Sequence, residues 1–239
     1  MIRTVVVLLF VGFICAVPLS ASAESLLMVP STNATPARVQ TVAEQIVFSF
    51  AAAAGEILDG AVGAPSVEVR NTPNLAYFDH RAQTIVLAHW PTLDQASRGF
   101  FFDLTDSEED AASLFVHLFN GFLVAHEMTH WLYRALGIER DRYSSEREAN
   151  DMAGAFFLGI ENGEALLLRL RPMLEAALAR LADPTPSRAD EAQFFNSRYG
   201  LLARNPYQYG YYQFRFILDS IDRRGEFDFA TRLAQLIKE

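Results

Sequence analysis

Cysteine is almost absent from this sequence, and the one that occurs lies near the amino terminus. The chain has 239 residues and a single cysteine, Cys15. A disulfide within one chain needs two cysteines, so none is expected. Lipidation of Cys15 would require small residues where the bulky Phe13 and Ile14 stand. Thiolate catalysis and cysteine-rich metal sites are therefore excluded from the chain that follows this segment.

Long apolar runs are also lacking, apart from one at the amino terminus. The run Thr4–Val17 is shorter than the roughly 20 residues that a membrane-spanning helix needs. Arg3 precedes it, and the small residues Ala21, Ser22 and Ala23 follow it, as at a signal-peptide cleavage site. We therefore predict a signal peptide over residues 1–23 and a single domain over residues 24–239. We expect this domain to be secreted or periplasmic, with no stable membrane span after signal cleavage.

Positive charge is scarce relative to negative charge. The chain has 20 Lys and Arg against 29 Asp and Glu, which gives a formal net charge of −9. An acidic surface repels the phosphate backbones of nucleic acids. Nucleic acid is therefore not an expected partner.

The pattern of apolar residues predicts an α+β fold with a small sheet and a mostly helical remainder. Three short segments rich in β-branched and aromatic residues, separated by turn residues, predict a small antiparallel sheet. These strands are expected at 66–70, 75–79 and 84–89. Apolar residues at helical spacing predict the remaining elements. Helices are expected at 36–58, from 106 to 136, from 145 onwards, and at 163–182, 187–204, 211–222 and 227–238.

The longest predicted helix contains the most informative part of the sequence. Thr105 or Asp106 is expected to cap its start, and Gly137 lies just past its end at Leu136. The pattern is interrupted near Asn120 and Gly121. A helix of this length provides a rigid frame for the residues that follow the interruption.

His126-Glu127-Met128-Thr129-His130 is an HExxH motif on that helix. Residues four apart lie on one helical face, so both imidazoles can bind one metal ion. Glu127 lies one position further round, where it can contact a water molecule on the metal rather than the metal itself. The motif alone is suggestive, and the predicted helix supplies the context that it requires.

A catalytic zinc site needs a third protein ligand and leaves a fourth position open. The metzincin pattern would place Gly at position 133 and His at position 136, where this chain has Tyr133 and Leu136. His80, His89 and His117 lack suitable spacing. The third ligand is therefore expected to be a carboxylate that follows the motif.

Glu146 is the preferred third ligand because it opens the next predicted helix. Ser145 and Glu148 have the spacing of a capping box, which would engage Glu148 at the helix start. Asn150, one turn after Glu146, is expected to hold the N–H of a ligand imidazole. Glu148 remains the alternative ligand.

These motifs together resemble the gluzincin metallopeptidases, in which HExxH is followed by a Glu on a later helix and an Asp or Asn four residues on. Here the matching residues are His126, Glu127, His130, Glu146 and Asn150. The pattern looks most like a family of small exported bacterial metallopeptidases of unknown substrate. The segment 74–79, followed by 84–87, resembles the strand pair ahead of the zinc helix in that family. The resemblance implies a zincin-like fold of minimal gluzincin type and one Zn²⁺ per chain.

The sequence departs from the gluzincin pattern in two places. Asn150 stands where an aspartate is commoner, and the chain has no histidine after His130. Several tyrosines occur in the carboxyl-terminal part instead, and we select Tyr209 as the residue that hydrogen-bonds the oxyanion of a tetrahedral intermediate. The alternative is that these tyrosines form aromatic packing.

The predicted function is zinc-dependent hydrolysis of peptide bonds in a protein or peptide substrate. Zinc would be held by His126, His130 and Glu146, and Glu127 would act as the general base. An extended peptide would bind along an exposed edge strand at 84–89. Three alternatives remain: a zinc-binding module without catalysis, a zinc amidase acting on cell-wall peptides, and a structural helical protein with a chance motif.

Overall fold

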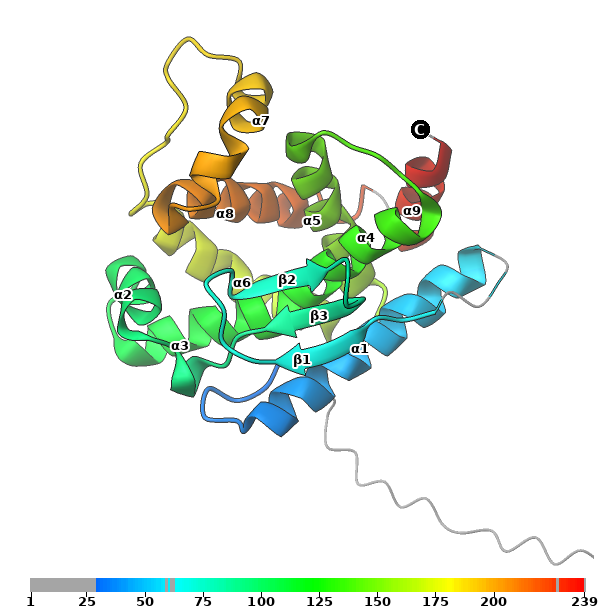
Figure 1. Ribbon diagram of the computed structural model, residues 1–239, viewed down its shortest axis with the longest axis horizontal. Helices are drawn as coiled ribbons and strands as arrows, with labels where there is room; N and C mark the ends of the chain where they lie inside the picture. Colours follow the sequence, from blue (N-terminus) through cyan, green and yellow to red (C-terminus); the bar gives the residue numbers. More distant parts are fainter. Residues whose placement is uncertain (1–28, 59, 61–62, 227, 239) are drawn as a thin grey trace, which may run out of the picture.

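The chain folds into a mostly helical structure with one small sheet (Figure 1). This computed structural model describes residues 29–58, 60, 63–226 and 228–238, so the predicted signal peptide lies outside the described residues. No helix among the described residues is long and apolar enough to cross a membrane. The α-helices are α1 (Pro36–Ile57), α2 (Gln95–Leu104), α3 (Glu108–His117), α4 (Leu123–Leu136), α5 (Arg142–Leu158), α6 (Gly163–Leu178), α7 (Glu191–Leu202), α8 (Pro206–Asp222) and α9 (Phe229–Lys238).

The α+β prediction is confirmed, but the sheet is mixed rather than antiparallel. Its strands β1 (Ser66–Val69), β2 (Ala76–Asp79) and β3 (Thr84–Leu87) lie in the order β1-β3-β2. Strands β2 and β3 form the predicted antiparallel hairpin, whereas β1 pairs with β3 in parallel. The prediction was wrong for this pair because β3 inserts between the two earlier strands. Because β1 and β2 run in opposite directions, a strand antiparallel to β2 runs parallel to β1.

The segment 84–89 was predicted to provide an exposed edge strand, and this prediction is wrong. All four residues of β3 are buried, and β3 pairs with a strand on each side. Val67, Ile85 and Phe78 lie side by side across the sheet and belong to the main hydrophobic core. The edge strands are β1 and β2, and β2 lies against α4.

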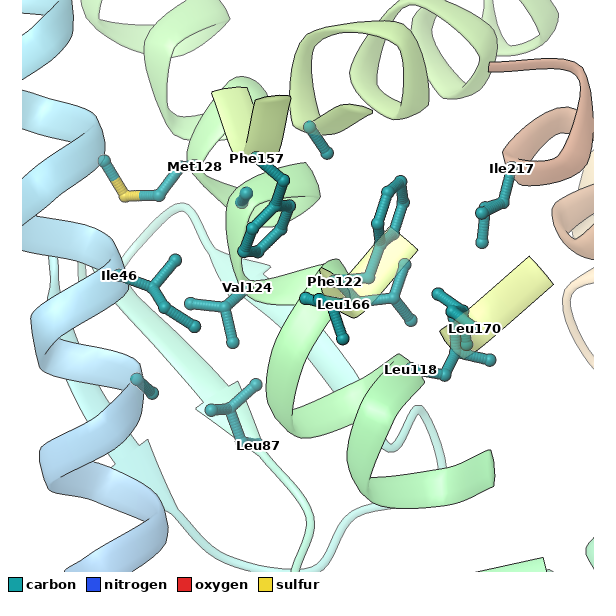
Figure 2. Close-up of a cluster of buried hydrophobic side chains, with 14 of the residues drawn as sticks. Ile46, Leu87, Leu118, Phe122, Val124, Met128, Phe157, Leu166, Leu170 and Ile217 are labelled. Atoms are coloured by element: carbon teal, nitrogen blue, oxygen red, sulfur yellow. The ribbon is translucent and has the colours of Figure 1, made fainter. Parts of the chain in front are cut away.

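Helix α4 lies within the core, between the sheet, α1 and the later helices. Ile46 of α1 and Leu87 of β3 lie near Val124 of α4, and Phe157 of α5 lies near Phe122 (Figure 2). Close packing of this kind leaves little freedom for a helix to shift. Helix α4 is therefore a fixed support for the side chains of the HExxH motif.

The predicted interruption near residues 120–121 is a π-helical turn, η2 (Leu118–Phe122), between α3 and α4. Asn120 in this turn donates its Nδ2–H to the backbone oxygen of Ala88 at 3.0 Å, which ties the turn to the end of β3. Such turns insert an extra residue and reorient the helix that follows. Gly137, with φ of 67°, ends α4 as predicted.

Two local predictions about the region before α4 need correction. The cap of α3 is Ser107, whose Oγ accepts from the N–H of Asp110 at 3.1 Å, and neither Thr105 nor Asp106. The Thr105 hydroxyl instead donates to Phe101 O at the end of α2. Helix α2 itself was not predicted, although Asp94 caps it with a side-chain hydrogen bond.

Helices α5 and α8 approach each other closely at a glycine. A Cβ atom on Gly154 would lie 2.4 Å from the Oγ of Ser220. That hydroxyl donates to the backbone oxygen of Asn150 at 3.0 Å. The close approach brings side chains from the earlier turns of α8 against α5, where Glu146 lies.

Candidate metal centre

His126 and His130 lie one turn apart on α4 and face the same point. Their Nε2 atoms are 3.0 Å apart, and their ring centroids are 4.7 Å apart. The side chain of His126 is only 4% exposed, whereas that of His130 is 18% exposed. The i, i+4 spacing of the motif therefore brings two imidazoles together, with access from the side of His130.

Glu146 joins the two histidines from the first turns of α5. Its Oε2 atom lies 3.3 Å from Nε2 of His126 and 3.9 Å from Nε2 of His130. Asp141 caps this helix by accepting from the N–H of Ser144, which fixes where α5 begins. The three donor atoms lie within 4.8 Å of one another, and in the described part of the chain they form the one such group.

These separations fit a tetrahedral metal ion. Donor atoms bound at about 2.0–2.1 Å at the corners of a tetrahedron lie about 3.3 Å apart. The observed separations of 3.0, 3.3 and 3.9 Å lie on both sides of that value. The buried cluster of His126, His130 and Glu146 can therefore hold a metal ion with small side-chain movements.

The charges at the cluster also suit a cation. Burial raises the pKa of Glu146, but the hydrogen bonds and charges of His126 and His130 outweigh burial and hold this pKa well below its ordinary value. Burial lowers the pKa of His130, but the hydrogen bond and charge of Glu146 outweigh burial and raise it above its ordinary value. In the metal-free cluster, Glu146 and His130 therefore each favour the charged form of the other.

Glu148, the alternative ligand, faces away from the cluster. Its carboxylate accepts hydrogen bonds from the Tyr133 hydroxyl at 2.9 Å and from Nε of Arg140 at 3.0 Å. The predicted capping box with Ser145 does not form, because α5 begins at Arg142 and Ser145 already lies within its first turns. The Ser145 Oγ lies 3.4 Å from Nδ1 of His130 instead.

Glu127 lies beside the cluster rather than in it. Its Oε2 atom accepts a hydrogen bond from the backbone N–H of Phe78 in β2, at 2.9 Å, and the residue is 8% exposed. This bond links the HExxH helix to the edge strand. The carboxylate of Glu127 is therefore held at β2 and is not one of the three clustered donors.

A hydrogen-bonded chain of polar side chains surrounds the cluster on the side of α8. Asn150 Oδ1 lies 2.9 Å from Nδ1 of His126, as the sequence predicts. Asn150 Nδ2 donates to Oε1 of Gln213 at 3.2 Å, and Gln213 Nε2 donates to Oε2 of Glu146 at 2.7 Å. Gln213 was not identified from the sequence.

Tyr209, selected from the sequence, lies one turn before Gln213 on α8, and its hydroxyl accepts from Gln213 Nε2 at 3.0 Å. Burial and the charge of Glu146 raise its pKa well above the ordinary value, so the phenol stays protonated. The sequence did not identify Tyr199 of α7, whose hydroxyl lies 3.4 Å from Oε1 of Glu146. Burial, followed by the charge of Glu146, raises the pKa of Tyr199 to about 12.

The two tyrosines are positioned by a small aromatic cluster that is separate from the main core. Phe195, Leu202, Tyr212 and Phe216 form its buried part, and Tyr199 and Tyr209 pack against it. Aromatic packing, the alternative interpretation of these tyrosines, therefore occurs together with their position beside Glu146. The spacing of Tyr209 and Gln213, four residues apart on one helix, was the available signal for Gln213.

The remaining histidines take no part in the cluster. His89 Nε2 bonds the backbone oxygen of Ala34, and His117 Nδ1 bonds that of Ser113. His80 follows β2 and packs its ring against Phe78. Desolvation lowers the pKa of His80, and the positive charge of His130 adds to this effect.

The chain was compared with protein-family models, curated proteins and solved structures. No protein-family model matches the chain, and no curated protein and no solved structure matches it either.

Proposed function

We propose that this protein is a secreted zinc peptidase of the gluzincin type, with a zincin-like fold. The observation that supports this most is the group of His126, His130 and Glu146, whose donor atoms lie within 4.8 Å of one another. Two imidazoles, one carboxylate and an open fourth position are typical of catalytic zinc, whereas structural sites use four protein ligands. The predicted signal peptide supports an extracytoplasmic location.

Zinc bound at these residues would polarise the scissile carbonyl and lower the pKa of a coordinated water molecule. In the proposed mechanism, Glu127 accepts the proton of the attacking water on its carboxylate and then passes it to the leaving amine. Its carboxylate accepts a hydrogen bond from the Phe78 N–H at 2.9 Å and is not one of the three clustered donors. These contacts support a role for Glu127 in moving a proton rather than in binding the ion.

The edge of β2 is the proposed binding site for an extended peptide substrate. The backbone N–H of Phe78 points away from β3, because it donates to Glu127 on α4. Backbone groups alternate along a strand, so those of Ala76 point to the same side, although its N–H already donates to Asn74 O at 2.7 Å. A substrate strand added along this edge would pass next to Glu127, which was not possible for the central strand β3.

Tyr209 and Tyr199 are the proposed donors to the oxyanion that forms during peptide hydrolysis. Both phenols are protonated at neutral pH, because burial and the charge of Glu146 raise their pKa values. A neutral hydroxyl close to the metal position can donate a hydrogen bond as negative charge develops on the substrate oxygen. These residues replace the histidine that the gluzincin pattern would place in the carboxyl-terminal part.

One observation favours a second candidate, a zinc-binding protein without turnover. His126 and Glu146 are only 3% and 4% exposed, and Glu127 is 8% exposed. Access to the metal position therefore depends on the side of His130. A substrate has to approach the metal position from that side, or the aromatic cluster around Phe195 has to move.

The test uses purified protein, loaded with zinc, and a peptide library whose products are identified by mass spectrometry. Glu127→Gln keeps the shape of the side chain but cannot accept the proton, so cleavage should fall about 100-fold or more. Zinc content should stay at one ion per chain. Glu139→Gln, which changes an exposed glutamate in the loop after α4, is the matched control and should cleave normally.

The same assay separates the candidates. Tyr209→Phe should lower kcat and leave zinc content unchanged if its hydroxyl donates to the oxyanion. Activity on cell-wall fragments but not on the peptide library would favour an amidase. Full activity in Glu127→Gln would contradict the proposed mechanism, and a zinc-loaded wild type that cleaves nothing would favour the module without turnover.

A further inference from the structure

The polar chain from Glu146 through Gln213 and Asn150 to His126 has only one consistent hydrogen-bond direction. Gln213 donates from its NH₂ group to Oε2 of Glu146 at 2.7 Å. The carbonyl oxygen of Gln213 then faces Asn150, which donates its NH₂ group at 3.2 Å. Asn150 also donates to the backbone oxygen of Glu146 at 3.0 Å, so two oxygens of Glu146, together with Gln213, set the orientation of both amides.

The same direction reaches the second ligand. With its NH₂ group facing Gln213, Asn150 presents Oδ1 to Nδ1 of His126 at 2.9 Å. An amide oxygen can only accept, so His126 has to donate from Nδ1, and Nε2 is then the nitrogen that can offer a lone pair to a metal ion. That Nε2 atom faces Glu146 Oε2 at 3.3 Å, where the metal would lie.

We propose that Gln213 and Asn150 form an amide relay, in which the carboxylate and backbone oxygens of Glu146 orient the two amides, and Asn150 in turn fixes the tautomer of His126 for metal binding. This inference rests on the proposed zinc site and adds Gln213 to it as a positioning residue. Gln213 and Asn150 are 8% and 0% exposed, so water cannot easily replace either amide. The relay also adds no charge, so Glu146 is the one anionic ligand of the cluster.

The relay explains why the asparagine at position 150 belongs with the glutamine at position 213. An aspartate at position 150 would still accept from His126, but it has no NH₂ group for the Gln213 oxygen. Gln213 would then have to turn its NH₂ group to the aspartate and its oxygen to Glu146. The bond between Gln213 and Glu146 would be lost.

The experiment measures the zinc dissociation constant by competition with a chromophoric chelator for wild type, Gln213→Met, Asn150→Asp and the double variant. Gln213→Met should weaken zinc binding about 10–100-fold, the usual effect of removing a partner of a metal ligand. In the Asn150→Asp background the same change should cost much less, because the bond to Glu146 is already broken there. Gln208→Met, at an exposed position of α8, is the matched control and should bind zinc as wild type does.

Histidine tautomers give a second readout that needs no variant. NMR of ¹⁵N-histidine-labelled wild type should show His126 protonated at Nδ1 in both the metal-free and the zinc-loaded protein. A His126 without a proton on Nδ1, a Gln213→Met affinity within twofold of wild type, or an equal cost in both backgrounds would overturn the relay. Because these readouts do not use peptide cleavage, the relay can stand when the peptidase proposal fails, whereas absence of zinc binding in wild type would overturn both.

Discussion

Helix α5 presents acidic side chains on two faces, and their partners differ in kind. On one face, Glu146 is surrounded by two histidines and the amide of Gln213. On the other, Asp151 pairs with Arg223 at 2.7 Å and with Arg232 of α9 at 3.4 Å. Glu148 is likewise bonded to an arginine, Arg140.

The difference separates a ligand from a structural carboxylate. Arginine remains charged at all ordinary pH values, so a carboxylate paired with it has its charge balanced permanently. Histidine can lose its proton and then offers a lone pair to a metal ion in place of a charge. Glu146 is therefore the carboxylate of α5 whose charge is left for a cation.

The largest expected effect is on zinc affinity, when Glu146 and Glu148 are each replaced by alanine. Glu146→Ala removes a ligand and should weaken zinc binding by more than the roughly 10–100-fold expected for an outer partner. Glu148→Ala should leave zinc affinity unchanged and cost about 1 kcal/mol of stability through its lost hydrogen bonds. Chelator competition and denaturant unfolding measure the two quantities, and loss of zinc from Glu148→Ala alone would reverse the assignment.

Removal of the metal should make stability depend on pH in a defined direction. His130 has a raised pKa in the metal-free protein, so its contribution is full below the unfolded value and is lost as pH rises through the folded value. Glu146 has a lowered pKa, so its contribution is present above the unfolded value and is lost as pH falls through the folded value. The metal-free protein should therefore be most stable between the two ordinary values, about 4.5 and 6.5.

The melting temperature measured between pH 5 and pH 8 checks this expectation. The metal-free protein should melt at a lower temperature at pH 8 than at pH 6, whereas excess zinc should raise the melting temperature most at the higher pH. A control in which His130→Ala abolishes both trends assigns them to the cluster. Identical pH profiles with and without zinc would show that metal and proton do not compete there.

The smallest effect is expected on the arginine-paired face. Asp151→Asn removes a carboxylate whose side chain is 13% exposed and with it the ion pairs to Arg223 and Arg232. Unfolding free energy should fall by about 1–3 kcal/mol, as for lost hydrogen bonds to charged groups. Zinc affinity should not change, and a large change would mean that the two faces of α5 are coupled.

The helix motifs were the most predictable part of the molecule, because their spacing is local. The positions of His126 and His130 on one face follow directly from the periodicity of α4. Glu146 lies with the two histidines as expected of a third ligand, but the capping box that supported its selection does not form, since Asp141 caps α5 instead. The carboxylate reaches the histidines because it lies early on the next helix.

Contacts that depend on packing between distant elements were not predictable from spacing. Gln213 and Tyr199 reach Glu146 from α8 and α7, and their positions depend on how these helices dock. The central position of β3 had a signal that was not used: residues 85–87 are apolar without alternation, as in strands covered on both faces. This apolar run, and not strand propensity, indicates that β3 is the central strand.

X-ray absorption spectroscopy at the zinc edge tests the central claim most directly. Protein purified without chelator and supplied with one equivalent of zinc should show two imidazole nitrogens at about 2.0–2.1 Å and oxygen ligands at about 2.0–2.2 Å. Glu146→Ala, if it retains zinc at all, should lose oxygen scattering and keep both imidazoles. A zinc shell with fewer than two imidazoles, or a wild type that takes up no zinc, would contradict a metal centre built from His126, His130 and Glu146.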